Sequence, residues 1–191
     1  TVLFSEESKF NLKDSDGIRR VHRPNGHRLN PKYCKSTVKH GGGNIMVWGC
    51  FSGQGIGPIH KIDGIMDRFM YRDILKDVML PYAEEEMPLK WTFQQDNDPK
   101  HTSKVVKEWF QNNLIEVLRW PAQSPDLNPI ENLWEIVNLK INRENCKTKE
   151  NLFEAVKIAW EAISPDIINN LISSMPKRCA CVIQNKGFAT K

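Results

Sequence analysis

The sequence lacks the features of several protein classes. None of its apolar runs reaches the roughly 18 residues that a membrane-spanning helix needs. It has no secretory signal, and its five cysteines form neither an even disulfide set nor the two pairs of a zinc site, so we expect free thiols. No Gly-Lys-Ser/Thr follows the glycine-rich stretch 41–57, which excludes a P-loop nucleotide site. We therefore expect one compact intracellular domain over residues 1–191 that does not engage a membrane.

An initiator methionine is also missing. The chain opens at Thr1, directly before the first expected strand. We therefore expect a fragment of a longer protein.

Two carboxylates stand in motifs that point to chemistry. Asp96 lies in Phe-Gln-Gln-Asp-Asn-Asp-Pro-Lys-His-Thr (93–102), Glu131 lies in Ser-Pro-Asp-Leu-Asn-Pro-Ile-Glu-Asn-Leu-Trp (124–134), and 34 residues separate them. The alternation over 91–96 predicts a strand that ends at Asp96, and Asn128 with Pro129 predicts a helix start that places Glu131 in the first turn. Paired acids suit a hard divalent cation such as Mg²⁺, which prefers oxygen ligands. The pattern indicates metal-dependent phosphoryl transfer.

The third acid that such a site needs is predicted to be Glu6. On the opening strand Glu6 shares a face with Val2, Phe4 and Phe10, whereas Glu7 lies on the other face. A carboxylate among apolar side chains is costly to bury unless a cation or a hydrogen-bond donor pairs with it. Glu6 is therefore a better ligand candidate than Glu7.

Each acid also has a structural interpretation. Glu131 can complete a capping box with Asn128, Asp96 can be a turn aspartate, and Glu6 can be a surface ion-pair partner. His101 can orient water or phosphate, but capping the next helix is at least as good an explanation, and we leave it outside the catalytic set.

Residues 13–40 hold eight basic and two acidic side chains, a net charge of +6 in a chain whose total is +4. Such a loop-rich basic excursion predicts contacts with DNA phosphates that weaken with salt, although a solvated hairpin with incidental charge remains the alternative. The predicted DNA-binding residues are Arg19, Arg20, Arg23, Arg28, Lys32, Lys35 and Lys39.

The order of elements predicts an α/β fold. A strand, a glycine-rich hairpin (about 44–51 and 57–63), a helix over 67–78 that ends near Pro81, a strand, a helix, a strand over 115–120 and further helices from 148 and 164 give a mixed sheet flanked by helices.

Segments 37–51, 95–106 and 123–134 closely resemble the catalytic domain of mariner-superfamily DNA transposases, particularly the Sleeping Beauty-like branch. The resemblance covers nearly the whole chain. It implies a ribonuclease-H-like fold and a catalytic triad of Asp, Asp and Glu that binds two Mg²⁺ ions, or Mn²⁺ in their place, for cut-and-paste transposition in the nucleus. Asp96 and Glu131 match the second and third acids. Glu6 stands where the family has the first Asp, so we expect attenuated or absent cleavage.

The resemblance also implies partners. The family's helix-turn-helix DNA-binding modules are absent here, and the 13–43 segment resembles the clamp loop that reaches a second subunit. We therefore expect a homodimer on transposon ends and TA-containing target DNA. The alternative is a domesticated DNA-binding or protein-pairing module whose chemistry has lapsed.

Overall fold

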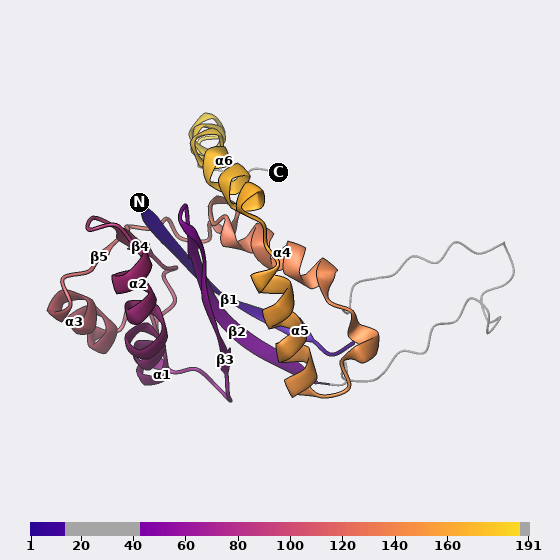
Figure 1. The fold of residues 1–191 in the computed structure, drawn as a ribbon. Coiled ribbons are helices and arrows are strands. Elements are labelled where there is room, and N and C mark those ends of the chain that lie inside the picture. Colours follow the sequence, from indigo (N-terminus) through magenta and orange to yellow (C-terminus); the bar gives the residue numbers. More distant parts are fainter. Residues whose placement is uncertain (14–42, 188–191) are drawn as a thin grey trace, which may run out of the picture.

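A five-stranded mixed sheet forms the centre of the computed structural model, which describes residues 1–13 and 43–187. The strand order is β3-β2-β1-β4-β5, with β1 antiparallel to β2 and parallel to β4, and with β4 parallel to β5 (Figure 1). This arrangement confirms the predicted mixed sheet. The strands are β1 Val2–Asn11, β2 Asn44–Ser52, β3 Gly55–Ile62, β4 Thr92–Gln94 and β5 Glu116–Val117.

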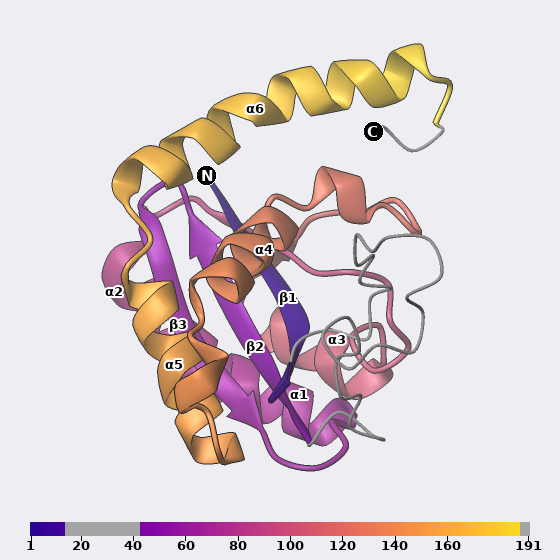
Figure 2. The same ribbon diagram turned by 90° about the vertical axis from the view of Figure 1, so that its right-hand side faces the viewer.

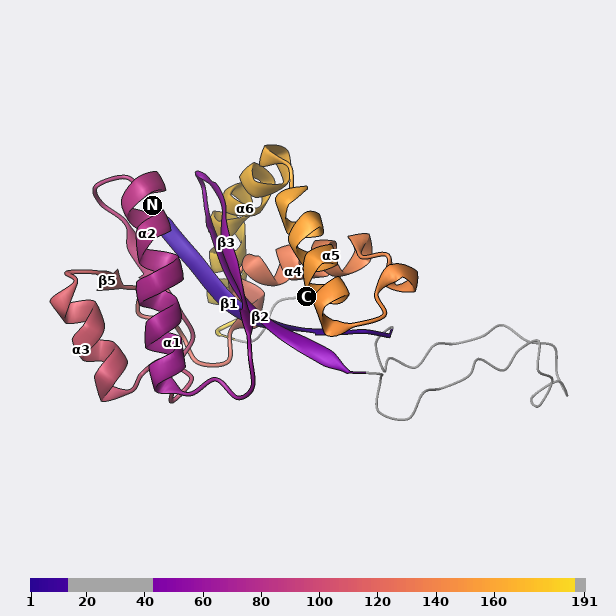
Figure 3. The same ribbon diagram turned by 60° about the horizontal axis from the view of Figure 1, so that its bottom comes forward.

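Helices cover both faces of the sheet (Figures 1 and 3). One face carries α1 (Arg68–Ile74), α2 (Leu80–Glu86) and α3 (Lys104–Asn112), and the other carries α4 (Ile130–Lys140) and α5 (Lys149–Glu161). Helix α6 (Pro165–Gln184) runs across one end of the molecule (Figure 2). Short 3₁₀ turns lie at Pro125–Leu127 and Arg143–Asn145. Among the described residues no helix has the length and apolar character needed to span a bilayer.

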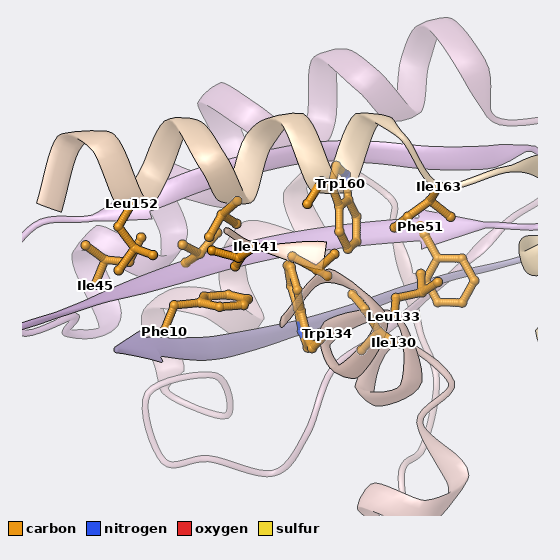
Figure 4. Close-up of a cluster of buried hydrophobic side chains, with 14 of the residues drawn as sticks. Phe10, Ile45, Phe51, Ile130, Leu133, Trp134, Ile141, Leu152, Trp160 and Ile163 are labelled. Carbon is orange, nitrogen blue, oxygen red and sulfur yellow. The ribbon is translucent and has the colours of Figure 1, made fainter. Parts of the chain in front are cut away.

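Alternate residues of β1 enter two separate cores, as the strand pattern predicts. Phe4 and Phe10 join the core beneath α4 and α5, whereas Leu3 joins the core beneath α1 and α3. In the first core the rings of Trp134 and Trp160 stack with centroids 4.6 Å apart (Figure 4). Glu6 therefore lies on the side of β1 that faces α4.

The predicted end of the helix near Pro81 is wrong. The helix begins at Arg68, where Asp67 caps it, and continues to Glu86 through a π-helical turn at Leu75–Met79. Proline lacks the N–H that an α-helical turn uses, and its ring clashes with the preceding turn. The wider π turn, in which the Leu80 N–H donates to the Leu75 carbonyl, lies directly before Pro81 and accommodates it.

The predicted strands after the hairpin are longer than the observed ones. The expected strand 115–120 is limited to β5, and the expected strand 91–96 is limited to β4. Beyond β4 the Asn97 side-chain amide donates to the Trp120 carbonyl at 2.9 Å. A side-chain bond thus holds together the chain segments that continue past the sheet, and it leaves Asp96 in a loop two residues after β4.

Gly49 provides a test of the packing beneath α4. A Cβ atom at this position would lie 2.7 Å from Cη2 of Trp134, and that ring is fixed by its stack on Trp160. Overpacking a core costs about 1–3 kcal/mol, so Gly49→Ala is expected to lower the free energy of unfolding by about 2 kcal/mol in urea denaturation. Gly53→Ala, which meets nothing within 4 Å, serves as the control. Equal losses in both variants would contradict the packing argument.

Candidate active site

Three carboxylates from three elements line one pocket. Phe4 of β1 pairs with Gln94 of β4 in parallel register, and Glu6 and Asp96 each follow two residues later. Glu6 lies in the middle of β1, and Asp96 lies two residues beyond the end of the shorter β4, so the parallel register sets the two acids side by side where β4 ends. Glu131 arrives from the first turn of α4. The three side chains line a cavity of about 390 Å³ together with Asn128 and the loop around 120–125.

Glu6 is partly buried and holds two hydrogen bonds. Its Oε2 accepts from Asn128 Nδ2 at 3.2 Å, and its Oε1 accepts from the Glu7 N–H at 3.1 Å. Burial is the main reason that the pKa of Glu6 rises to about 7, and the negative charges of Glu7, Asp96 and Glu131 add to the rise. The pocket therefore concentrates negative charge that a cation would neutralise.

Asp96 is oriented by His101, which lies in the loop before α3. His101 Nδ1 is 2.5 Å from Asp96 Oδ1, and His101 Nε2 is 3.1 Å from Glu7 Oε1. The hydrogen bond to His101 lowers the pKa of Asp96. Burial lowers the pKa of His101, but the bonds to Asp96 and Glu7 outweigh it and raise that pKa to about 9. At neutral pH the protonated imidazole of His101 thus links Asp96 to Glu7 of β1.

The imidazole of His101 is itself fixed in place. It is 3% exposed, and its ring lies 4.0 Å from the ring of Tyr71. The Tyr71 hydroxyl donates to Gln95 Oε1 at 2.8 Å, and Gln95 Nε2 donates to the His101 carbonyl. These contacts leave His101 little freedom to rotate away from Asp96.

Several alternatives raised by the sequence are resolved here. The Asn128 N–H donates to the Pro125 carbonyl, so it is not available to Glu131 as a capping box requires. The N-cap of α3 is Ser103, so the alternative in which His101 caps this helix is wrong. Asp96 is also a turn aspartate, because its Oδ1 accepts from the Asp98 N–H at 3.0 Å, and the Asp98 carboxylate in the same turn accepts from the backbone and side chain of Lys100.

The donor chemistry of the pocket fits a hard divalent cation, since Glu6, Asp96 and Glu131 line it and Asp98 adds a fourth carboxylate. In the described residues, however, no three His, Cys, Asp or Glu side chains are arranged to hold one ion. The carboxylate of Asp96 is turned toward His101 and that of Glu6 toward Asn128. Burial and the charge of Glu135 raise the pKa of Glu131.

The predicted DNA-binding residues lie outside the part of the chain that the structure describes, as does most of the 13–43 segment. A further basic residue, Arg178 of α6, forms hydrogen bonds within the protein. It donates to the Asp126 carbonyl at 3.1 Å and to Asn132 Oδ1 at 2.7 Å. Arg178 thereby ties α6 to the turn that precedes Glu131.

Sequence reasoning gave no role to Glu7, and it left His101 outside the site. One signal could have found them. Glu7 shares the face of β1 that carries the buried Leu3, and a carboxylate on a buried face needs a partner. The Asp96 motif supplies two cations to Glu7, since His101 Nε2 lies 3.1 Å and Lys100 Nζ 3.5 Å from its carboxylate oxygens.

A family model and individual relatives all assign this chain to the same protein family. The family model described as DDE superfamily endonuclease matches residues 1–153. The Tcb2 transposase of Caenorhabditis briggsae is 51% identical over 189 residues, covering 99% of this chain and 69% of that protein. The Tc1 transposase of Caenorhabditis elegans is 49% identical over 189 residues, with the same coverage.

Two solved structures share the fold. The mariner Mos1 paired-end complex with Mg has a TM-score of 0.85 at 16% identity, covering 100% of this chain and 56% of that chain. The catalytic domain of Mos1 mariner transposase has a TM-score of 0.73 at 15% identity, covering 100% of this chain and 84% of that chain. This likeness confirms the ribonuclease-H-like fold. The family model and the two Caenorhabditis relatives show that the chain belongs to the Tc1 branch of the Tc1/mariner transposases and carries their DDE catalytic domain.

Proposed function

We propose that this chain is the catalytic core of a cut-and-paste DNA transposase. It cleaves DNA at transposon ends and joins the freed 3′ ends to target DNA at TA dinucleotides. The observation that carries the proposal is the pocket lined by Glu6 of β1, Asp96 of the loop after β4 and Glu131 of the first turn of α4. Side chains that are far apart in the sequence thus gather around one space.

The three acids are the proposed holders of Mg²⁺, with Mn²⁺ able to take its place. Divalent ions at such a site activate water as the nucleophile and neutralise charge on the phosphodiester. Among the described residues Asp96 Oδ2 has no hydrogen-bond partner, because His101 and the Asp98 N–H both engage Oδ1. His101 therefore fixes one oxygen of Asp96 and leaves the other for a cation.

We propose that cleavage is slow or absent because of Glu6. Its side chain is one methylene longer than the aspartate expected there, which moves the carboxylate by about 1.5 Å, one C–C bond. A misplacement on the order of 1 Å can cost about 100-fold in rate where positioning supplies the catalysis. Asn128 and the Glu7 N–H hold Glu6 in its present position.

A second candidate function is a DNA-binding or protein-pairing module whose chemistry has lapsed. Glu6 in place of aspartate favours this second function. So does the finding that, within the described residues, no three His, Cys, Asp or Glu side chains are arranged to coordinate one ion. Metal titration separates the two candidates. A catalytic core binds Mn²⁺ through Asp96 and Glu131, whereas a lapsed module shows no binding that depends on these side chains.

The direct test is nicking of supercoiled plasmid DNA by the purified 191-residue chain in Mg²⁺ or Mn²⁺. We expect weak metal-dependent nicking that Asp96→Asn and Glu131→Gln each remove. Glu116→Gln, an exposed acid on β5, is the control and is expected to nick like the unchanged chain. If Asp96→Asn still nicks DNA at the rate of the unchanged chain, the proposal is wrong.

The partners follow from the same proposal. The basic residues between 19 and 39 contact DNA, the 13–43 segment pairs two copies on DNA, and the protein acts in the nucleus, where chromosomal DNA lies. The surplus of positive charge in this segment supports the DNA contact. Replacing Arg19, Arg20 and Arg23 with glutamate tests it through the salt dependence of DNA binding.

A further inference from the structure

A second cavity, of about 350 Å³, lies beside the acid pocket and is lined by residues of α3 and of β5 with the segment that follows it. Asp96, Asn97 and Trp120 line both cavities, and the hydrogen bond from Asn97 to the Trp120 carbonyl lies where they meet. The two cavities therefore adjoin and share this wall. The volume lies within the range of about 300–1,000 Å³ that is typical of small-molecule pockets.

The walls of the second cavity are mainly apolar. Phe110 of α3 contributes to them, together with Ile115, Val117 and Leu118 in and around β5. The last three side chains are only partly buried. Because β5 is two residues long, little of the sheet covers these side chains. The cavity thus offers an apolar surface to a flat, uncharged group.

The rim of the second cavity is cationic and polar. Lys107 and Arg119 line it, both are exposed, and neither has an ion-pair partner within residues 1–13 and 43–187. Gln111 adds an exposed amide. Positive charge here contrasts with the acidic pocket next to it. The combination of an aromatic ring, apolar walls and unpaired cations matches a base with its phosphate.

We propose that this cavity binds one unpaired nucleotide of the DNA strand whose phosphodiester lies in the acid pocket. The base packs against Trp120 and the apolar walls, and the neighbouring phosphate contacts Lys107 and Arg119. A base within a duplex cannot enter, so the site selects a nucleotide that has left the stack, as at a strand end. The inference rests on the proposed function, because DNA is the substrate in both.

Binding of an overhang tests the inference without any chemistry. The 191-residue chain is titrated, in EDTA, into a DNA duplex with a three-nucleotide 3′ overhang that carries 2-aminopurine, and into the same duplex with a blunt end. We expect the overhang to bind about tenfold more tightly and its 2-aminopurine fluorescence to be quenched, since base–aromatic stacking is sequence-tolerant and substantial.

Two residues of α3 give a matched pair of variants. Lys107→Glu is expected to reduce the preference for the overhang about tenfold. Lys104→Glu makes the same charge change on the same helix, but Lys104 faces Glu108 rather than the cavity and is expected to leave the preference unchanged. Gln111→Trp, which fills the cavity from its exposed rim, is expected to remove the quenching, and Gln111→Ala to retain it. Circular dichroism confirms that each variant is folded.

The outcomes separate this inference from the proposed function. Equal binding of blunt and overhanging duplexes, or equal effects of Lys104→Glu and Lys107→Glu, would overturn the nucleotide site even if plasmid nicking is observed. Overhang binding that depends on Lys107 would support the site even if the acids prove inactive. A cavity occupied by a protein partner instead would show neither the overhang preference nor the quenching.

Discussion

Replacing Glu6 with aspartate is expected to raise the rate of metal-dependent DNA cleavage about 100-fold, the penalty that a misplacement on the order of 1 Å imposes on catalysis by positioning. The shorter side chain withdraws the carboxylate from Asn128 Nδ2 and returns it toward β1. In-line phosphoryl transfer is sensitive to this change, because two ions about 3.5–4 Å apart must serve the attacking and leaving oxygens. The measurement is the initial rate of plasmid nicking in Mg²⁺ and in Mn²⁺.

Glu6→Gln is the matched control for this prediction. It keeps the length of the side chain and removes its charge, so it is expected to show no gain and to weaken Mn²⁺ binding in calorimetry. If the rates of the unchanged chain and of Glu6→Asp are equal, the length of the first acid does not limit cleavage. The lapsed-module alternative would gain if neither protein nicks DNA or binds metal.

Substituting His101 is expected to change how stability depends on pH in the metal-free protein. The pKa of His101 is about 9 in the folded chain, against 6.5 for an ordinary histidine. A raised histidine pKa stabilises the fold fully below pH 6.5, and this stabilisation is lost as pH rises through about 9. A shift of this size corresponds to about 3 kcal/mol. The free energy of unfolding should fall by about that amount between pH 6.5 and 9.

Urea denaturation in EDTA at a series of pH values measures this effect. In His101→Asn the fall above pH 7 should largely disappear, since no imidazolium then links Glu7 to Asp96. His60→Asn, on β3 away from the acids, should retain the fall. Glu6 also makes the free energy of unfolding fall as pH rises, but over a lower range. Its pKa is raised from 4.5 to about 7 in the folded chain, so the fold loses stability between these two pH values. Identical profiles for His101→Asn and the unchanged chain would contradict the assigned role.

Strand alternation predicted much of this architecture. The period of two along β1 correctly separated the face of Glu6, with Phe4 and Phe10, from the face of Leu3 and Glu7. The motif around Asn128 correctly placed Glu131 in the first turn of a helix, but the helix begins at Ile130 with Pro129 as its N-cap, one residue later than predicted. These features are local, and local patterns record which side of an element is buried.

Features that depend on contacts between distant segments were not predictable in this way. The continuation of the helix through Pro81 depends on a π turn, and no residue pattern marks such a turn in advance. The link from Glu7 to His101 joins residues 94 positions apart, and it needs the register of β1 against β4 to be known. The same register brings Glu6 beside Asp96, so the site itself is a product of sheet pairing rather than of either motif.

The junction between β1 and β2 has a practical consequence for protein engineering. Asn11 pairs with Asn44, and the Leu12 N–H donates to the Gly43 carbonyl at 3.0 Å, so the two strands are already joined where the chain leaves and re-enters the sheet. Hairpin connections of two to five residues are common between antiparallel strands. We accordingly expect that a short turn can replace residues 14–42 with the sheet retained, which would allow the acid pocket to be studied apart from this segment.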